Sequence, residues 1–273
     1  MSDTVALAGF LPQEICAALD IRPDFRGKQI FSWIAKGAQS FDEMTNLPLA
    51  LRTSLAQKAV VRSAAAERVF SDDDGSVKLQ IRLRDNRFIE TVLLTDAAGR
   101  QTVCVSCQTG CPMRCAFCRT GQLGSGRNLW AAEIVEQFLI MEKLRGTLDN
   151  IVFMGMGEPM LNLDAVCQAI RVLTSPEGRA LSARRITVST SGVIDGIYAL
   201  ADSGLQVRLA VSLTTADPVL RAELMPVART NPLPELRRAI SYFTEKTKKR
   251  CTLEAALFSQ VNTDKKSTAA LID

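Results

Sequence analysis

Residues 108–118 read QTGCPMRCAFC, which sets Cys111, Cys115 and Cys118 in a Cys-x3-Cys-x2-Cys pattern. Three thiolates on one tight loop can each hold one iron of a 4Fe–4S cube, and the fourth iron is then open to a small ligand. Closed clusters and structural zinc sites usually take four protein ligands. The chain has no histidine, and no Cys-x2-Cys pair lies further along it. The pattern therefore favours an open-site iron–sulfur cluster, with chance clustering of buried cysteines as the alternative.

Composition limits the class of protein. The chain has 273 residues, of which 47% are apolar and 23% charged, enough for one large core and a small second domain. The net charge of +4 permits an RNA partner without demonstrating one. Basic clusters occur at Arg184-Arg185, Arg237-Arg238 and residues 246–250. They indicate either phosphate contacts or ordinary solvated helix ends.

The cysteines and the N-terminus indicate a compartment. Five of the eight cysteines lie between Cys104 and Cys118, unlike the spread of a disulfide scaffold. Residues 1–10 contain no basic residue, so no signal peptide is expected. No apolar run approaches about 18 residues, so no membrane span is expected. We expect a cytoplasmic protein.

The chain divides into three predicted parts. Residues 1–62 read as a small helical N-terminal accessory domain that could bind RNA, with helices over 11–15, 25–38, 42–44 and 47–59. Residues 63–98 read as a β-hairpin extension with strands at 69–70, 77–83 and 88–94. From residue 99 to 273, strands at 102–106, 150–154, 185–189, 207–213 and 251–257 alternate with helices at 131–144, 163–173, 194–203, 233–244 and 265–273. Glu133 and Glu136 are expected on the polar side of the helix at 131–144. The predicted fold class is α/β, a partial (β/α)6-type barrel of about five βα units.

Candidate site residues follow four of these strands. The cysteine loop follows the first, residues 155–159 (GMGEP) the second and residues 189–192 (STSG) the third, while Ser212-Leu213-Thr214 ends the fourth. Loops at the carboxyl ends of parallel strands meet at one rim, where active sites of such barrels lie. Glycines let a backbone pass close to a ligand, and Glu158 offers a carboxylate to a cation. An ordinary turn, or a helix cap for each serine, is the structural alternative.

Two residues upstream of the rim have open assignments. Cys104 could point into the cavity or be a small buried residue. Glu90 alternates with apolar neighbours, so it is either a solvent-facing carboxylate or a base tucked against the site.

With these motifs in order, the chain resembles the radical S-adenosylmethionine (SAM) enzymes, and most closely the RlmN/Cfr-type RNA adenine methyltransferases. The resemblance runs from residues 25–30 (FRGKQI) to Val261-Asn262. Its specific parts are residues 90–92 (ETV), 104–106 (CVS), 155–159 (GMGEP), 188–192 (VSTSG) and 209–213 (LAVSL).

The resemblance implies a radical SAM barrel and a radical methyl transfer to C2 of an adenine in 23S rRNA and in tRNA. The 4Fe–4S cluster would be held by Cys111, Cys115 and Cys118, and S-adenosyl-L-methionine by Gly157, Glu158, Ser189, Ser212, Leu213 and Thr214. One electron, from a donor such as flavodoxin or ferredoxin, would cleave the cofactor to a 5′-deoxyadenosyl radical. Glu90 matches the proposed proton acceptor, and Cys104 matches the cysteine that closes a disulfide as the product leaves.

Two departures from the family are expected to matter. The family carries its methyl-bearing cysteine in a C-terminal segment beyond the fifth strand, and none of the eight cysteines stands there. Thr214 also replaces the histidine usual after Ser-Leu. Two other readings therefore stay open: a radical SAM enzyme acting on another substrate, and a truncated cofactor-binding remnant unable to transfer methyl.

Overall fold

The computed structural model describes residues 4–272, and its centre is an open eight-stranded sheet in the order β10-β9-β8-β7-β6-β5-β4-β3. The strands are β3 (Ala64–Ser71), β4 (Val77–Leu83), β5 (Phe88–Thr95), β6 (Gln101–Cys104), β7 (Asn150–Phe153), β8 (Ile186–Thr190), β9 (Arg208–Ser212) and β10 (Cys251–Glu254). Strands β6 to β10 pair in parallel, whereas β3, β4, β5 and β6 pair antiparallel. The predicted five βα units and the hairpin extension are confirmed.

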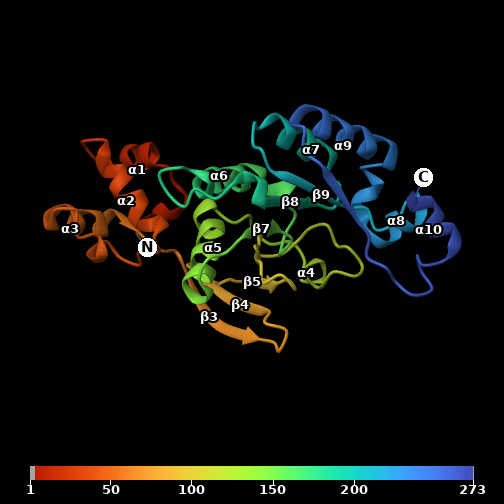
Figure 1. Ribbon diagram of the computed structural model, residues 1–273, viewed down its shortest axis with the longest axis horizontal. Helices are drawn as coiled ribbons and strands as arrows, with labels where there is room; N and C mark the ends of the chain where they lie inside the picture. The colour runs from red at the N-terminus through yellow and green to blue at the C-terminus, as the bar shows by residue number, and fades with distance from the viewer. Residues whose placement is uncertain (1–3, 273) are drawn as a thin grey trace.

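The N-terminal part is helical, as predicted, and lies at one end of the long axis in Figure 1. Its helices are α1 (Pro12–Leu19), α2 (Phe25–Ala35) and α3 (Leu49–Lys58). A two-residue parallel pair, β1 (Val5–Ala6) with β2 (Ala59–Val60), closes it. Helix α2 ends three residues before the predicted Ala38, because Gly37 turns the chain with a φ of +94°. One hydrophobic core runs from these helices into the sheet, so the boundaries at residues 62 and 98 stay predictions.

The remaining helices connect and flank the parallel strands. They are α4 (Arg119–Gln122), α5 (Ala131–Arg145), α6 (Leu163–Thr174), α7 (Ile194–Asp202), α8 (Pro218–Leu224), α9 (Leu233–Thr247) and α10 (Lys265–Ile272). Helices α4 and α8 are additions to the predicted set. None of the helices described here is long and apolar enough to span a membrane.

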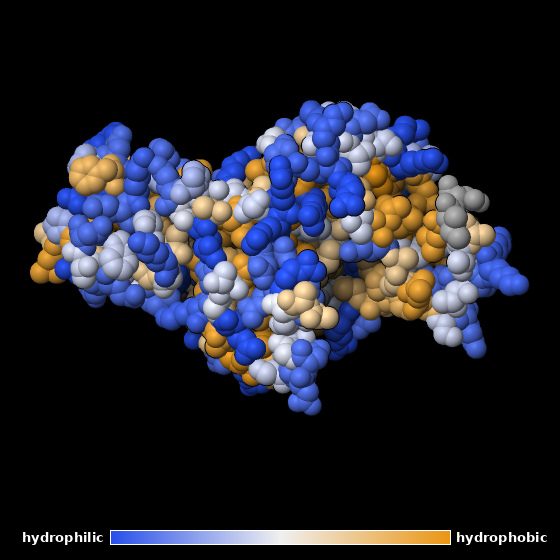
Figure 2. Space-filling model, in the orientation of Figure 1, coloured by the Kyte–Doolittle hydropathy of each residue, from blue (hydrophilic) through white to orange (hydrophobic). Residues whose placement is uncertain are grey.

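The last strand is shorter than predicted. It ends at Glu254 rather than Leu257, because the Asn262 amide organises the following loop: its Nδ2 donates to Ala256 O at 2.8 Å, and its Oδ1 accepts from Phe258 N at 2.7 Å. Figure 2 shows apolar residues gathered towards this end of the molecule. Its large exposed apolar side chains are Val219, Leu253, Leu257 and Val261.

Candidate metal centre and cofactor site

The parallel order of β6, β7, β8 and β9 brings the four candidate loops to one rim. The backbones of the first two are joined directly: Cys107 N donates to Met156 O at 2.8 Å, and Gly155 N donates to Val105 O at 3.1 Å. The Glu158 carboxylate then reaches the third loop, where it accepts from Ser191 N at 2.8 Å. The first three loops are therefore hydrogen-bonded to one another.

The cysteine loop is closed on itself and braced against α8. Cys111 N donates to Gly124 O at 3.0 Å, and Ala116 N donates to Leu224 O at 2.8 Å. A side chain at Gly110 would place its Cβ 2.4 Å from Gly124 O, so glycine is required there. The Phe117 ring packs against Phe258 with 5.2 Å between ring centroids. These contacts between described residues hold the loop in its observed conformation.

The three cysteines form a donor set that fits a cluster. Cys111 is buried, while Cys115 and Cys118 are half-buried. The pKa of Cys115 is raised to about 11, mainly by burial and also by the nearby charges of Cys118 and Glu158, whereas Arg221 lowers it. Within residues 4–272, no three His, Cys, Asp or Glu residues converge on a single metal ion. A cuboidal cluster needs no such convergence, because each thiolate binds a different iron.

Arg221 of α8 is a site residue that the sequence analysis missed. It is 0% exposed. Its Nη2 donates to Ser191 O at 2.8 Å and its Nε to Leu213 O at 3.1 Å, so it joins the ends of β8 and β9. Its Nη1 is buried with no hydrogen-bond partner among the described residues. No short motif marks it, because all its partners are backbone carbonyls.

The glycine–glutamate segment is packed tightly against the neighbouring loops. A Cβ on Gly157, whose φ is +108°, would lie 2.8 Å from Cys107 Sγ, and one on Gly155 would lie 2.8 Å from Ser106 Oγ. The glycines are thus required by protein packing. Glu158 is 3% exposed and accepts bonds from Ser191 Oγ at 2.7 Å and Met160 N at 3.1 Å. Burial raises its pKa, and these bonds lower it.

The segment from Ser212 to Thr214 is held by two residues of the last described loop and strand. Glu254 O accepts from Leu213 N at 2.8 Å and from Thr214 N at 3.0 Å. Asn262 Nδ2 donates to Thr214 O at 3.0 Å. Burial raises the pKa of the Glu254 carboxyl, and a hydrogen bond from Ser189 lowers it. Glu254 and Asn262 were not predicted as site residues, since neither stands in a short local motif.

Glu90 and Cys104 lie on the same face of the sheet. Val92 pairs with Cys104, and Glu90 is two residues from Val92, so the alternation of the strand puts both side chains on one side. Cys104 is half-buried, and burial raises its pKa to about 11. The Glu90 carboxylate is 48% exposed and pairs with Lys78 Nζ at 3.2 Å. The solvent-facing reading of Glu90 is the one observed.

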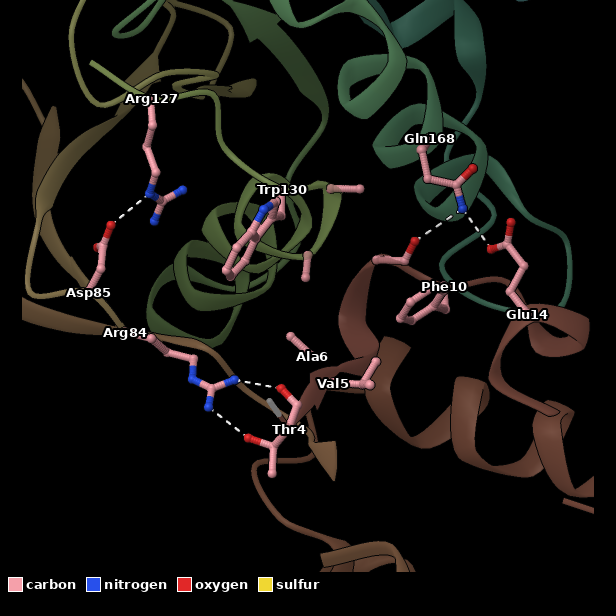
Figure 3. Close-up of a pocket in the computed structure, with 13 residues that line it drawn as sticks. Thr4, Val5, Ala6, Phe10, Glu14, Arg84, Asp85, Arg127, Trp130 and Gln168 are labelled. Carbon is pink, nitrogen blue, oxygen red and sulfur yellow. Dashed lines mark hydrogen bonds and ion pairs between the residues drawn. The ribbon is translucent and has the colours of Figure 1, made fainter. Parts of the chain in front are cut away.

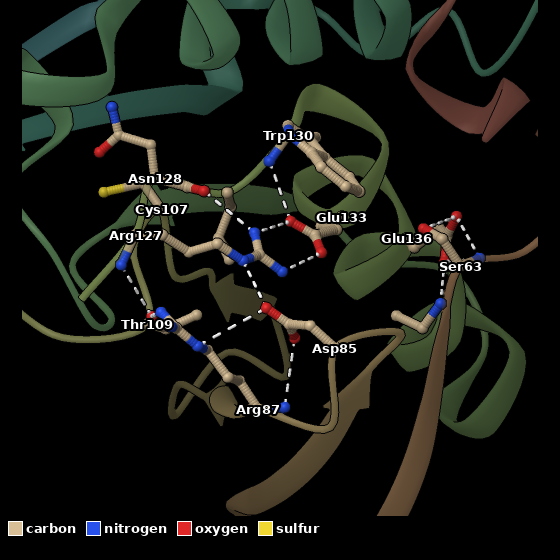
Figure 4. Close-up of polar contacts among 12 residues, drawn as sticks. Ser63, Asp85, Arg87, Cys107, Thr109, Arg127, Asn128, Trp130, Glu133 and Glu136 are labelled. Carbon is tan, nitrogen blue, oxygen red and sulfur yellow. Dashed lines mark hydrogen bonds and ion pairs between the residues drawn. The ribbon is translucent and has the colours of Figure 1, made fainter. Parts of the chain in front are cut away.

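A network of ion pairs ties the hairpin to the cysteine loop (Figure 4). Arg127 contacts Asp85 at 2.6 Å and the fully buried Glu133 at 2.7 Å. Thr109, beside the cysteine loop, accepts from Arg127 N at 3.0 Å and from Arg87 Nη1 at 3.3 Å. Glu133 and Glu136 had been expected on a polar helix face. Both are buried instead, because Arg127 satisfies Glu133 while Ser63 and Ala64 satisfy Glu136.

A cavity of about 770 Å³ lies away from the cysteines, between the N-terminal segment and α5 (Figure 3). Its polar groups bond mainly to one another: Arg84 donates to Thr4, and Gln168 donates to Glu14 at 2.7 Å. The cavity lies at the interface between the N-terminal part and the sheet, and none of the predicted site residues lines it.

Comparisons with known proteins match this arrangement. A model of the Radical SAM superfamily matches residues 105–272, and a model of the ribosomal RNA large subunit methyltransferase N-terminal domain matches residues 13–61. A crystal structure of a radical SAM methyltransferase from Sphaerobacter thermophilus superimposes with a TM-score of 0.92 at 40% identity, covering 98% of this chain and 80% of that one.

Three similar proteins have the same description. The chain is 56% identical over 268 residues to a probable dual-specificity RNA methyltransferase RlmN of Treponema pallidum, covering 98% of this chain and 79% of that protein. The corresponding protein of Treponema denticola is 57% identical, with 98% and 77% covered. That of Heliobacterium modesticaldum is 46% identical, with 94% and 70% covered.

Proposed function

The chain belongs to the RlmN-type dual-specificity RNA methyltransferases of the radical SAM superfamily, and we propose that it methylates C2 of an adenine in 23S rRNA and in tRNA. The observation that carries this proposal is the cysteine loop at the same rim as the segments after β7, β8 and β9. Adenine C2 is not nucleophilic, which accounts for radical chemistry at this target.

Members of the superfamily use a 4Fe–4S cluster and SAM. Together these supply, when bound, one-electron cleavage of a carbon–sulfur bond. Cys111, Cys115 and Cys118 would hold the cluster on their prefixed loop. The cofactor would lie against Gly157-Glu158, Ser189 and the segment Ser212-Leu213-Thr214. The rim excludes water behind the site, since Glu158 and Thr214 are buried.

Glu90 and Cys104 are proposed to act on the substrate side. Glu90 lies exposed beside Lys78, where its Oε1 or Oε2 can accept a proton from the substrate. The raised pKa of about 11 keeps the Cys104 thiol protonated at neutral pH. A flavodoxin or ferredoxin would deliver the electron, and the reaction would take place in the cytoplasm, where ribosomal and transfer RNA occur.

The first experiment tests the cofactor assignment. Anaerobic reconstitution of the wild-type chain should load a 4Fe–4S cluster, and dithionite should then release 5′-deoxyadenosine from SAM. Cys115→Ala should lose both, whereas Cys167→Ala, in α6, should keep both. Retention of a full cluster by Cys115→Ala would refute the ligand assignment.

The second experiment tests the substrate. Mass spectrometry of a 23S rRNA fragment should detect 2-methyladenosine when the reconstituted protein includes the C-terminal segment with the family's methyl-bearing cysteine. The chain as given should form none by itself, because none of its eight cysteines stands at that position. Release of 5′-deoxyadenosine without methylated adenine would favour the cofactor-binding remnant. Absence of any RNA binding would favour a radical SAM enzyme with another substrate.

A further inference from the structure

Three neighbouring strands begin beside an arginine. The amino ends of these strands lie at the end of the sheet opposite the cysteine loop. Arg185 precedes β8, Arg208 opens β9 and Arg250 precedes β10. Because β8, β9 and β10 are adjacent and parallel, these residues lie in a row with about 4.8 Å between neighbouring strands.

Three more cations extend this row. Two cavities of about 560 and 610 Å³ open here, and both are lined by Arg184 and Arg208. The amino-edge basic surface is defined as Arg184, Arg185, Arg208, Lys248, Lys249 and Arg250. It joins two basic clusters that lie far apart in the sequence.

The charges of this surface are poorly compensated. Within residues 4–272, only one of the six forms an ion pair, Arg185 with Asp149 at 3.7 Å. Asp96, which lines the same region, pairs with Arg100. Like charges at this spacing repel one another, so a bound polyanion stabilises the surface.

We propose that the amino-edge basic surface binds the phosphate backbone of the RNA substrate. The proposal rests on the RNA methyltransferase function proposed above and names part of its substrate-binding surface. An acidic electron donor fits less well, because it must approach the cluster. The five residues of β8 span about 16 Å from the amino ends of the strands to their carboxyl ends. A folded RNA is long enough to contact the surfaces at both ends of the strands.

The test measures RNA affinity against salt concentration. Fluorescence anisotropy with a 23S rRNA fragment and with tRNA compares the wild type with the triple variant Arg184→Ala/Arg208→Ala/Arg250→Ala. Each lost phosphate contact should lower the slope of log affinity against log salt by about 0.7–0.9. The triple variant should therefore lose about two units of slope, and affinity should fall about tenfold or more at low salt.

The matched control is Lys143→Ala/Arg145→Ala/Arg237→Ala, which removes three exposed cations that form no ion pair among the described residues. This control should keep the wild-type slope. Equal slopes for the two triple variants would overturn the proposal. Normal RNA binding with slower reduction by flavodoxin would also overturn it, in favour of an acidic protein partner. A wild type that binds no RNA would instead refute the proposed function.

A separate observation, the buried Nη1 of Arg221, carries a second inference. Arg221 has carbonyl partners but no carboxylate within hydrogen-bonding distance in the described part of the chain. A buried cation without a counter-ion is strongly disfavoured. Its helix α8 contacts the cysteine loop directly, because Leu224 O accepts from Ala116 N, the residue after Cys115, at 2.8 Å. We infer that Arg221 is the positioning residue whose charge balances the anionic cluster.

The midpoint potential of the reconstituted cluster tests this role. Arg221→Gln should shift the potential to more negative values, because a nearby positive charge stabilises the reduced, more negative cluster. Arg221→Lys keeps the charge and should stay close to the wild type. Arg229→Gln, an exposed arginine after α8, is the matched control.

Iron content and circular dichroism show whether each variant folds and loads. An unchanged potential in a fully loaded Arg221→Gln variant would overturn the inference. So would an equal shift in Arg221→Lys, because lost hydrogen bonds rather than lost charge would then explain it.

Discussion

Thr214 combines a β-branched side chain with a left-handed backbone. Its φ is +64°, a region that costs most residues about 1–2 kcal/mol and that β-branched residues rarely adopt. The conformation persists because both backbone groups are held, the N–H by Glu254 and the carbonyl by Asn262. Strain at a proposed cofactor contact is consistent with a preorganised site.

Replacing Thr214 with a residue that tolerates this backbone should stabilise the protein. Thr214→Asn is expected to raise the free energy of unfolding by about 0.5–1 kcal/mol, measured by urea denaturation. Thr215→Asn, at a position without a positive φ, is the control and should give no gain. A neutral or destabilising Thr214→Asn would mean that the side chain contributes more than the backbone strain costs.

At this scale the sequence predicts residues whose chemistry depends on local spacing. The cysteine loop was identified because its three thiols are close in the chain. Arg221 could not be, because its partners come from two other loops and are all carbonyls. Glu158 was identified, but its direction was not, since its contact with Ser191 depends on how β7 and β8 pair.

Among the elements, α5 joins the N-terminal part to the sheet through one buried carboxyl. Glu136 accepts from Ser63 N at 2.8 Å, Ser63 Oγ at 2.9 Å and Ala64 N at 2.7 Å. Burial raises its pKa to about 7, although these bonds and Arg62 lower it. The stability of the segment that enters β3 therefore depends on the protonation state of Glu136.

The Glu136 contact should make stability depend on pH. The folded pKa of about 7 exceeds the usual value of 4.5 for a glutamate. The protonated Glu136 therefore contributes its full stabilisation below about pH 4.5, and this stabilisation is lost as pH rises through about 7. Urea denaturation from pH 5 to 8 should show the wild type losing up to about 3 kcal/mol relative to Glu136→Gln. Parallel pH profiles for the two proteins would contradict the raised pKa.

Element type and order could be predicted because strand and helix periods are local signals. The strands and helices from residue 101 onward match the prediction closely, apart from the short α4 and α8. The burial of Glu133 and Glu136 could not be predicted. A polar position on α5 is expected to face solvent unless the contacts of Arg127 and Ser63 with it are known.

Across the whole molecule, the edge strands of the sheet differ from the central strands in how many neighbours they pair with. Strands β7 and β8 are paired on both sides, whereas β10 is paired only with β9 within the described chain. Edge strands open at lower free energy than central ones. Because β10 supplies Glu254, which holds Leu213 and Thr214, opening at this edge also loosens the proposed cofactor segment.

Hydrogen exchange measured by mass spectrometry tests this gradient. Amides of residues 251–254 should exchange at least about tenfold faster than those of 186–190, a difference of about 1.4 kcal/mol in opening free energy. Strand β3, the opposite edge, pairs with β4 over a longer register and should exchange at an intermediate rate. Adding SAM to the reconstituted protein should slow exchange at 251–254, because a ligand on Ser212–Thr214 stabilises the segment that Glu254 holds. If β10 exchanges as slowly as β8 without the cofactor, the edge is stable by itself and this coupling is wrong.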